Sequence, residues 1–198
     1  MADKLTKSQK PVEIDESLVY NSVCDRNSGE IVFTKADGSE VSMNLNGATA
    51  GDISDVMLAH KDIYEACPSF NNIIHNASSE VVAVSRLGKT MKPLLDDFAQ
   101  IVGVTVKHAG YNPNNSLATS KKVVKALKGR NAVLLENNGA LCVAGSEYDA
   151  GAIEFITNKG AKIQVSAKMF DKVEPINPLE TRIMNLVYRL KYSKQAGK

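Results

Sequence analysis

The sequence predicts one layered domain of the α/β or mixed α and β class. Short apolar runs bounded by Asn-Gly or Asp-Gly, which are typical of strands joined by tight turns, alternate with longer stretches whose apolar residues recur at helical spacing. Strands that alternate with helices pack as layers around a shared core. The length of 198 residues suits one domain, which we place at residues 13–192, with loosely held tails at 1–12 and 193–198.

The composition narrows the class of function before any motif is considered. A net charge of +2 is too small to argue for nucleic acid or a membrane surface as a partner. Trp is absent and aromatic residues make up 6%, which argues against a base-stacking platform. No apolar run approaches the roughly 18 residues that cross a bilayer, and the polar, Lys-rich N-terminus is unlike a secretory signal. We expect a soluble, cytoplasmic protein whose three cysteines, Cys24, Cys67 and Cys142, are reduced.

The most distinctive stretch is 131–145, which reads NAVLLENNGALCVAG. Two apolar runs, at 132–135 and 140–144, flank the polar residues 136–139. Asn and Gly tolerate the positive φ that a tight turn requires, so the stretch predicts two buried strands joined by an Asn-Gly turn. An ordinary hairpin turn accounts for the pattern, and a polar functional site is the alternative.

The remaining elements follow from the same two periodicities. In chain order they are a possible short helix within 13–24, a hairpin of 30–34 and 40–43, a helix at 55–66, a strand at 71–75, a helical or extended segment at 80–87, a brief strand at 104–106, and helices at 120–127, 147–168 and 179–190. Side-chain oxygens cap helices, which makes Asp52 or Ser54 the cap of the first long helix and Ser116 or Thr119 the cap of the next. Gly129 stands where a helix C-terminus favours glycine.

Several segments together carry a family resemblance. They are HKDIY at 60–64, ACPSFNNIIHNA at 66–77, PLLDDFAQIVG at 93–103, and the hairpin at 132–145. Their order and spacing, over about residues 54–167, resemble the class II aldolase/adducin family, which includes fuculose-phosphate aldolase and ribulose-phosphate 4-epimerase. The resemblance implies a three-layer α/β/α domain with a central, mostly antiparallel sheet. It also implies a homo-oligomer, often a tetramer with sites at the subunit interfaces.

The resemblance implies a zinc site, and this chain departs from it at two of three ligands. The family places a His-x-His pair at the end of a strand and a third histidine in an Asn-His-Gly turn. Here His75 matches the first histidine, whereas Ala77 and Asn138 stand at the other two positions. Alanine has no donor atom and a neutral amide oxygen is a poor zinc ligand. We therefore expect no cofactor, and zinc or another divalent cation only if the site has been rebuilt.

The family's base and phosphate loop are also altered. The position of the catalytic glutamate falls on Val56, which cannot move a proton, and Asp55 beside it is a weak substitute. The glycine-rich phosphate loop has no clear match, because the similar letters at 51–54 lie too near His75. The candidates for contact with a substrate are Ser54, Asn76 and Asn138.

Two functions follow, from different classes. The first is a divergent family member without zinc chemistry that serves as an oligomeric binding, scaffold or regulatory protein. The alternative is a metal-dependent lyase or epimerase that acts on a small sugar phosphate. Its rebuilt site would draw on His60, His75, Asp96, Asp97, His108 and Glu136. The concurrent loss of ligands and base favours the first function.

Simpler roles are also expected for several of these residues. His75 would be a hydrogen-bonded, half-buried histidine, and the pair His60 and Tyr64 would lie at a surface or an interface. Asp96 and Asp97 are expected at a helix N-terminus, since adjacent residues on a helix point apart.

Overall fold

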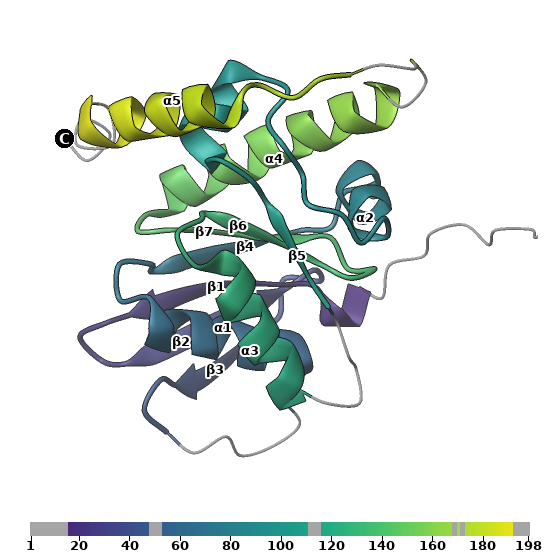
Figure 1. Ribbon diagram of the computed structural model, residues 1–198. Helices are drawn as coiled ribbons and strands as arrows, with labels where there is room; N and C mark the ends of the chain where they lie inside the picture. The colour runs from purple at the N-terminus through teal and green to yellow at the C-terminus, as the bar shows by residue number, and fades with distance from the viewer. Residues whose placement is uncertain (1–15, 48–52, 111–115, 168–169, 171–172, 192–198) are drawn as a thin grey trace, which may run out of the picture.

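A seven-stranded sheet forms the middle layer of the computed structural model, which describes residues 16–47, 53–110, 116–167, 170 and 173–191 (Figure 1). The strands are β1 Tyr20–Asp25, β2 Glu30–Lys35, β3 Glu40–Asn44, β4 Asn72–Asn76, β5 Lys107–Ala109, β6 Ala132–Leu135 and β7 Ala140–Ala144. They lie in the order β3-β2-β1-β4-β7-β6-β5. The β5–β6 pair is parallel and the other five pairs are antiparallel, which confirms the predicted mostly antiparallel sheet.

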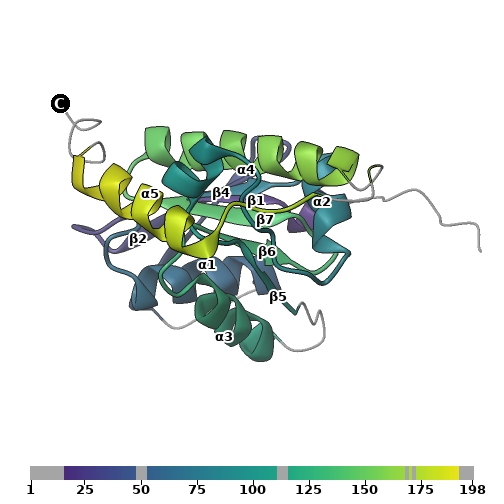
Figure 2. The same ribbon diagram turned by 45° about the horizontal axis from the view of Figure 1, so that its top comes forward.

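Helices cover both faces of this sheet, as expected for three layers (Figure 2). Helices α1 Asp55–Ala66 and α3 Ser116–Leu127 pack on one face, over a buried cluster that includes Ile63, Val123 and Leu141. Helices α2 Ser79–Ser85 and α4 Glu147–Ala167 and the π-helix η2 Phe98–Val102 cover the other face. Helix α5 Pro178–Lys191 lies outside against η2, and a 3-10 turn, η1 Glu16–Leu18, precedes β1.

None of the helices in the described ranges combines the length and apolarity needed to span a bilayer.

Several predicted boundaries were wrong. In 13–24, residues 16–18 form the short helical turn η1, in line with the predicted short helix, whereas residues from Tyr20 onward form strand β1, which was not predicted and whose alternate residues face the core. The strand predicted at 104–106 lies at Lys107–Ala109, where it pairs with β6, and Val106 instead makes an isolated bridge to Met91. Helix α3 begins at Ser116, four residues early, so that Thr119 lies inside the helix and cannot cap it.

The β6–β7 hairpin is formed as predicted, with every strand residue buried. Its turn uses positive φ at Asn137 (61°) and Gly139 (75°), and the Leu135 amide donates to the Gly139 carbonyl at 2.9 Å. The turn also presses on the end of β4. A Cβ added at Gly139 would lie 2.1 Å from the carbonyl oxygen of Asn76. Glycine is therefore required at this position by both its conformation and the lack of space.

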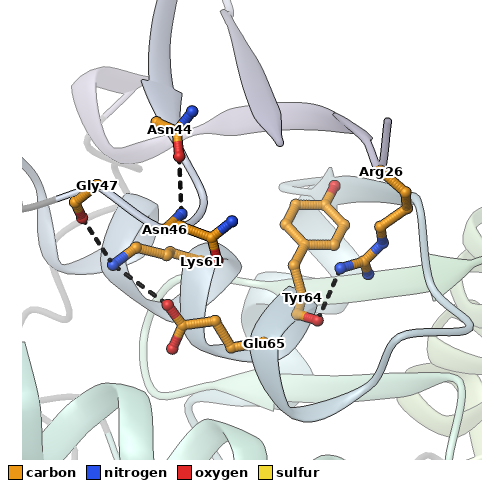
Figure 3. A network of polar contacts seen from close by, with 7 residues as sticks. All are labelled: Arg26, Asn44, Asn46, Gly47, Lys61, Tyr64 and Glu65. Atoms are coloured by element: carbon orange, nitrogen blue, oxygen red, sulfur yellow. Dashed lines mark hydrogen bonds and ion pairs between the residues drawn. The ribbon is translucent and has the colours of Figure 1, made fainter. Parts of the chain in front are cut away.

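Arg26 joins the β1–β2 turn to the C-terminal end of α1 (Figure 3). Its guanidinium donates to the carbonyl of Tyr64 at 3.1 Å, to that of Cys67 at 3.3 Å and to that of Phe70. It also donates to Asn71 Oδ1 at 3.0 Å and stacks over the Tyr64 ring. The last carbonyls of a helix have no partner within the helix, so the planar, multiply donating Arg26 satisfies groups that a Lys would leave open.

The contact at Gly139 gives a first testable prediction. Gly139→Ala should lower the free energy of unfolding by about 3 kcal/mol or more, because the methyl group meets backbone in a strained conformation. The matched control is Gly38→Ala, where φ is 81° and nothing lies within 4 Å of the new methyl group. That variant should lose only about 1–2 kcal/mol. Urea unfolding measures both, and equal losses would contradict the role of the Asn76 contact.

Candidate functional site

His75 lies near the end of β4, buried, on the side of the sheet that α1 covers. Its Nε2 is 2.7 Å from the Asn138 carbonyl oxygen, and the Tyr20 amide donates to its Nδ1 at 3.4 Å. A carbonyl can only accept and a peptide N–H can only donate, so the imidazole is neutral and carries its proton on Nε2. Both ring nitrogens are therefore engaged by backbone groups, and neither offers a free lone pair to a metal.

The two buried histidines on this side of the sheet are held neutral. Burial lowers the pKa of His75 to about 4, although the hydrogen bond to Asn138 opposes the shift. Burial also places the pKa of His60 well below its usual value, and the proximity of His75 lowers it further. Each imidazole is therefore uncharged at neutral pH.

The other two family ligand positions offer no better donors. Asn138 is buried, its carbonyl holds His75, and its side-chain Nδ2 has no partner among the described residues. Ala77, half-buried, contributes only a methyl group. Within the described ranges, no group of three or more His, Cys, Asp and Glu side chains lies close enough to hold a metal ion. The residues present therefore do not fit the zinc site that the resemblance implies.

His60 belongs to a buried hydrogen-bonded chain with Ser22 and Tyr64, so its predicted place at a surface or interface was wrong. Tyr64 Oη donates its one proton to the Ser22 carbonyl at 2.8 Å. Ser22 Oγ lies 2.8 Å from both Tyr64 Oη and His60 Nδ1, so it must donate to the tyrosine and accept from the histidine. This leaves His60 Nε2 without a proton and, among the described residues, without a partner.

The first turn of α1 holds the residues expected to act as base and substrate contact. Ser54 caps the helix, as predicted, by accepting from the Met57 amide at 3.2 Å. Val56, at the place of the family's glutamate, is buried in the core. Asp55 is also buried, and its Oδ2 has no partner within the described ranges. Among the described residues, Asp55 is therefore the carboxylate at this end of α1 that could face a ligand, where the helix N-terminus stabilises negative charge.

The remaining candidates lie apart from His75. Asn76 points to the opposite face, where its Nδ2 donates to the Glu154 carbonyl at 3.2 Å and its Oδ1 accepts from the Ser78 amide at 3.1 Å. Asp97 accepts from the Phe98 amide at 2.8 Å and pairs with Lys159, in the helix N-terminal role that was expected. Asp96 precedes it in the chain. His108, half-buried on β5, and Glu136, in the β6–β7 turn, complete the set and join no metal-binding group in the described part of the chain.

Two cavities lie at the other end of the strands, and no sequence signal predicted them. One, of about 150 Å³, lies between β7 and the helices α4 and α5 and includes Phe70, Asn131 and Asn185 in its lining. The second, of about 640 Å³, shares Phe70 and Asn131 with the first and includes Arg130 and Arg189. Both lie at the end of β7 near Gly145, whereas the Asn138 turn is at the other end.

Comparison with known proteins agrees with this architecture. The model of the Class II Aldolase and Adducin N-terminal domain matches residues 22–165. Among solved structures, an L-fuculose 1-phosphate aldolase has a TM-score of 0.75 at 23% identity, over 86% of this chain and 85% of that one. The Escherichia coli protein YgbL has a TM-score of 0.71 at 18% identity, over 87% and 89% of the two chains. The L-fuculose-1-phosphate aldolase from Thermus thermophilus has a TM-score of 0.63 at 18% identity, over 81% and 89%. At these identities the structures share the fold, and a search of curated proteins finds no match.

The neutral His75 predicts how stability depends on pH. The unfolded chain takes up a proton near pH 6.5 and the folded chain only near pH 4, so the free energy of unfolding falls as the pH falls through this window. Between pH 7.5 and 5.0 the loss from His75 is about 2 kcal/mol, and His60 adds to it in the same direction.

The matched variant is His75→Gln, whose amide keeps a donor for the Asn138 carbonyl and stays neutral at every pH. Urea unfolding at the two pH values should show a smaller drop for the variant than for the wild type. Equal drops would mean that His75 is not the neutral, backbone-bonded group described above.

Proposed function

We propose that this chain, which belongs to the class II aldolase and adducin family, keeps the fold of that family as a non-catalytic binding, scaffold or regulatory protein. The observation that carries the proposal is the state of His75. Both of its ring nitrogens are bonded to backbone groups, and the two companion positions are Ala77 and Asn138. The His75 side chain instead holds the backbone of the β6–β7 turn, at Asn138, against β4.

The energetics support this interpretation. Coordination through His75 Nε2 would remove its proton and leave the buried Asn138 carbonyl without its donor, which costs about 1–3 kcal/mol. One imidazole would then have to hold the ion alone, whereas a catalytic zinc site usually has three protein ligands. Val56, packed in the core, has no proton to exchange with a substrate.

Further parts of the proposal come from the resemblance and the composition. They are assembly into a homo-oligomer, a cytoplasmic location, and a small sugar phosphate as a ligand that is bound without turnover. Asp55 and Asn138, each with a buried polar atom that has no partner among the described residues, are the side chains we assign to such a ligand.

The alternative, a lyase or epimerase with a rebuilt metal site, stays a prediction. Its candidate ligands are spread over both faces of the sheet: His60 is a residue of α1 and His75 lies on the face that α1 covers, whereas Asp97 pairs with Lys159 of α4. The same experiment decides between the two functions.

The test combines metal analysis with activity assays. The purified chain, incubated with zinc and desalted, should retain far less than one zinc per chain and should neither cleave nor epimerise a panel of ketose and aldose phosphates. A sugar phosphate that raises the melting temperature without giving product would identify the ligand class.

His75→Gln serves as the matched variant, since it keeps the donor to Asn138 and removes the only imidazole at the family's ligand positions. Near-stoichiometric zinc in the wild type that is lost in this variant, or a product from any sugar phosphate, would overturn the proposal in favour of the lyase or epimerase.

A further inference from the structure

Helix α5 turns its polar side toward the protein and its apolar side toward the solvent. Its two buried residues are Thr181, which donates to the Asn177 carbonyl at 3.0 Å, and Asn185, which donates to the Gln100 carbonyl at 2.9 Å. Five large apolar residues are 42 to 66% exposed, and they are Leu179, Ile183, Leu186, Val187 and Leu190. A surface helix of a soluble protein normally buries its apolar stripe, so this arrangement is inverted.

Helix α4 carries two further exposed aromatic residues. Tyr148 is 76% and Phe155 66% exposed, and a spacing of seven residues places them on one face of α4. The first half of α4 lies beside the last half of α5, since both line the cavity of about 150 Å³. We call these two exposed aromatic residues together with the five exposed residues of α5 the α4–α5 apolar surface.

We propose that the α4–α5 apolar surface is where a second copy of this chain docks, with α5 packed antiparallel against α5 of the partner. This surface would mediate the homo-oligomer that forms part of the proposed function. The docking proposal rests on the proposed function only for the formation of a homo-oligomer, because the exposure of α5 does not depend on whether the chain binds zinc.

The size of the surface suits such a contact. Seven large side chains that are 42 to 76% exposed leave apolar area on the order of 600–800 Å². A standard stable interface buries about 800 Å² on each partner, and homodimer interfaces are the more apolar class. Isolated monomers rarely expose a contiguous apolar patch of more than a few hundred Å².

The spacing along α5 suits a twofold pairing. Leu179, Ile183, Leu186 and Leu190 are separated by four, three and four residues, which is the pattern of a coiled-coil seam. This spacing is the same from either end. A twofold axis midway between Ile183 and Leu186 would thus set Leu179 against the partner's Leu190 and Ile183 against the partner's Leu186. The antiparallel arrangement also opposes the two helix dipoles favourably, and a contact of this kind closes as a dimer.

The first test measures mass in solution for the full chain by sedimentation velocity and light scattering. The wild type should have a mass that is an even multiple of 21.4 kDa at micromolar concentration. The double variant Ile183→Glu/Leu186→Glu should have half that mass or less, with an unchanged far-UV circular dichroism spectrum, because both residues are exposed in the single chain. The control is Val23→Glu, which changes an equally exposed apolar residue, 51% accessible, on β1 and should keep the wild-type mass.

The second test determines the direction of pairing by disulfide formation. Leu179→Cys and Leu190→Cys are made as separate proteins in a Cys67→Ser background, which removes the half-buried cysteine while Cys24 and Cys142 stay buried. Two copies of the same variant would hold their new thiols about 16 Å apart, too far to join. Only a mixture of the two should give a covalent dimer on mild oxidation.

Several outcomes would overturn the proposal. The first is a wild-type mass of 21.4 kDa at every concentration, whether or not the chain binds vesicles of phosphatidylcholine and phosphatidylserine, since binding to vesicles alone would make a lipid surface the occupant. The second is a multimer that persists in the double variant. The third is a disulfide that forms within either cysteine variant alone. These readouts are separate from zinc content and product formation, so a failure here is distinguishable from a failure of the proposed function.

Discussion

The contact between the β6–β7 turn and the end of β4 is the constraint on which the rest of the structure depends. Gly139 lies against the Asn76 carbonyl with no room for a side chain, and the neighbouring Asn138 carbonyl accepts the proton of His75. These two contacts fix β4 beside β7, so that Asn76 pairs with Ala140 at the centre of the sheet. Both buried clusters are built on these central strands, one under α1 and α3 and the other under α2 and α4.

The same contact determines the chemistry of this end of the sheet. A histidine that holds a carbonyl and accepts a peptide N–H is a structural hydrogen-bonding group, and burial keeps it neutral. Ser54 and Asn76 are likewise engaged, one as a helix cap and the other between α4 and the start of α2. Buried polar groups are costly unless they are paired, so each of these side chains stabilises the fold through the atoms it would otherwise offer to a ligand.

Turn and cap residues in the sequence predicted the helices and strands, whereas contacts between residues far apart in the chain determine which side chains are buried. The β6–β7 turn followed from Asn and Gly, and helix α1 began after Ser54 as its cap required. The burial of His60 could not be predicted, because its partner Ser22 lies 38 residues away on another element. The periodicity of α5 was visible in the sequence, but its orientation depends on the Gln100 carbonyl, 85 residues from Asn185. The family motifs predicted the three layers. Only the structure shows that both ring nitrogens of His75 are hydrogen-bonded to backbone groups.

The polar residues at the end of β4 have partners within the chain, whereas the apolar residues of α5 are exposed. At the end of β4, His75 and Asn76 have partners within the chain, and their choice follows from the folding of a single copy. On α5 the buried side chains are those of Thr181 and Asn185, and Asn185 bonds to the Gln100 carbonyl of the body, whereas the leucines are exposed. Apolar side chains that a monomer leaves in water weaken its solubility without stabilising its core. The proposed pairing with a second copy would account for their regular seven-residue pattern, so the sequence of α5 points to a partner rather than to a substrate.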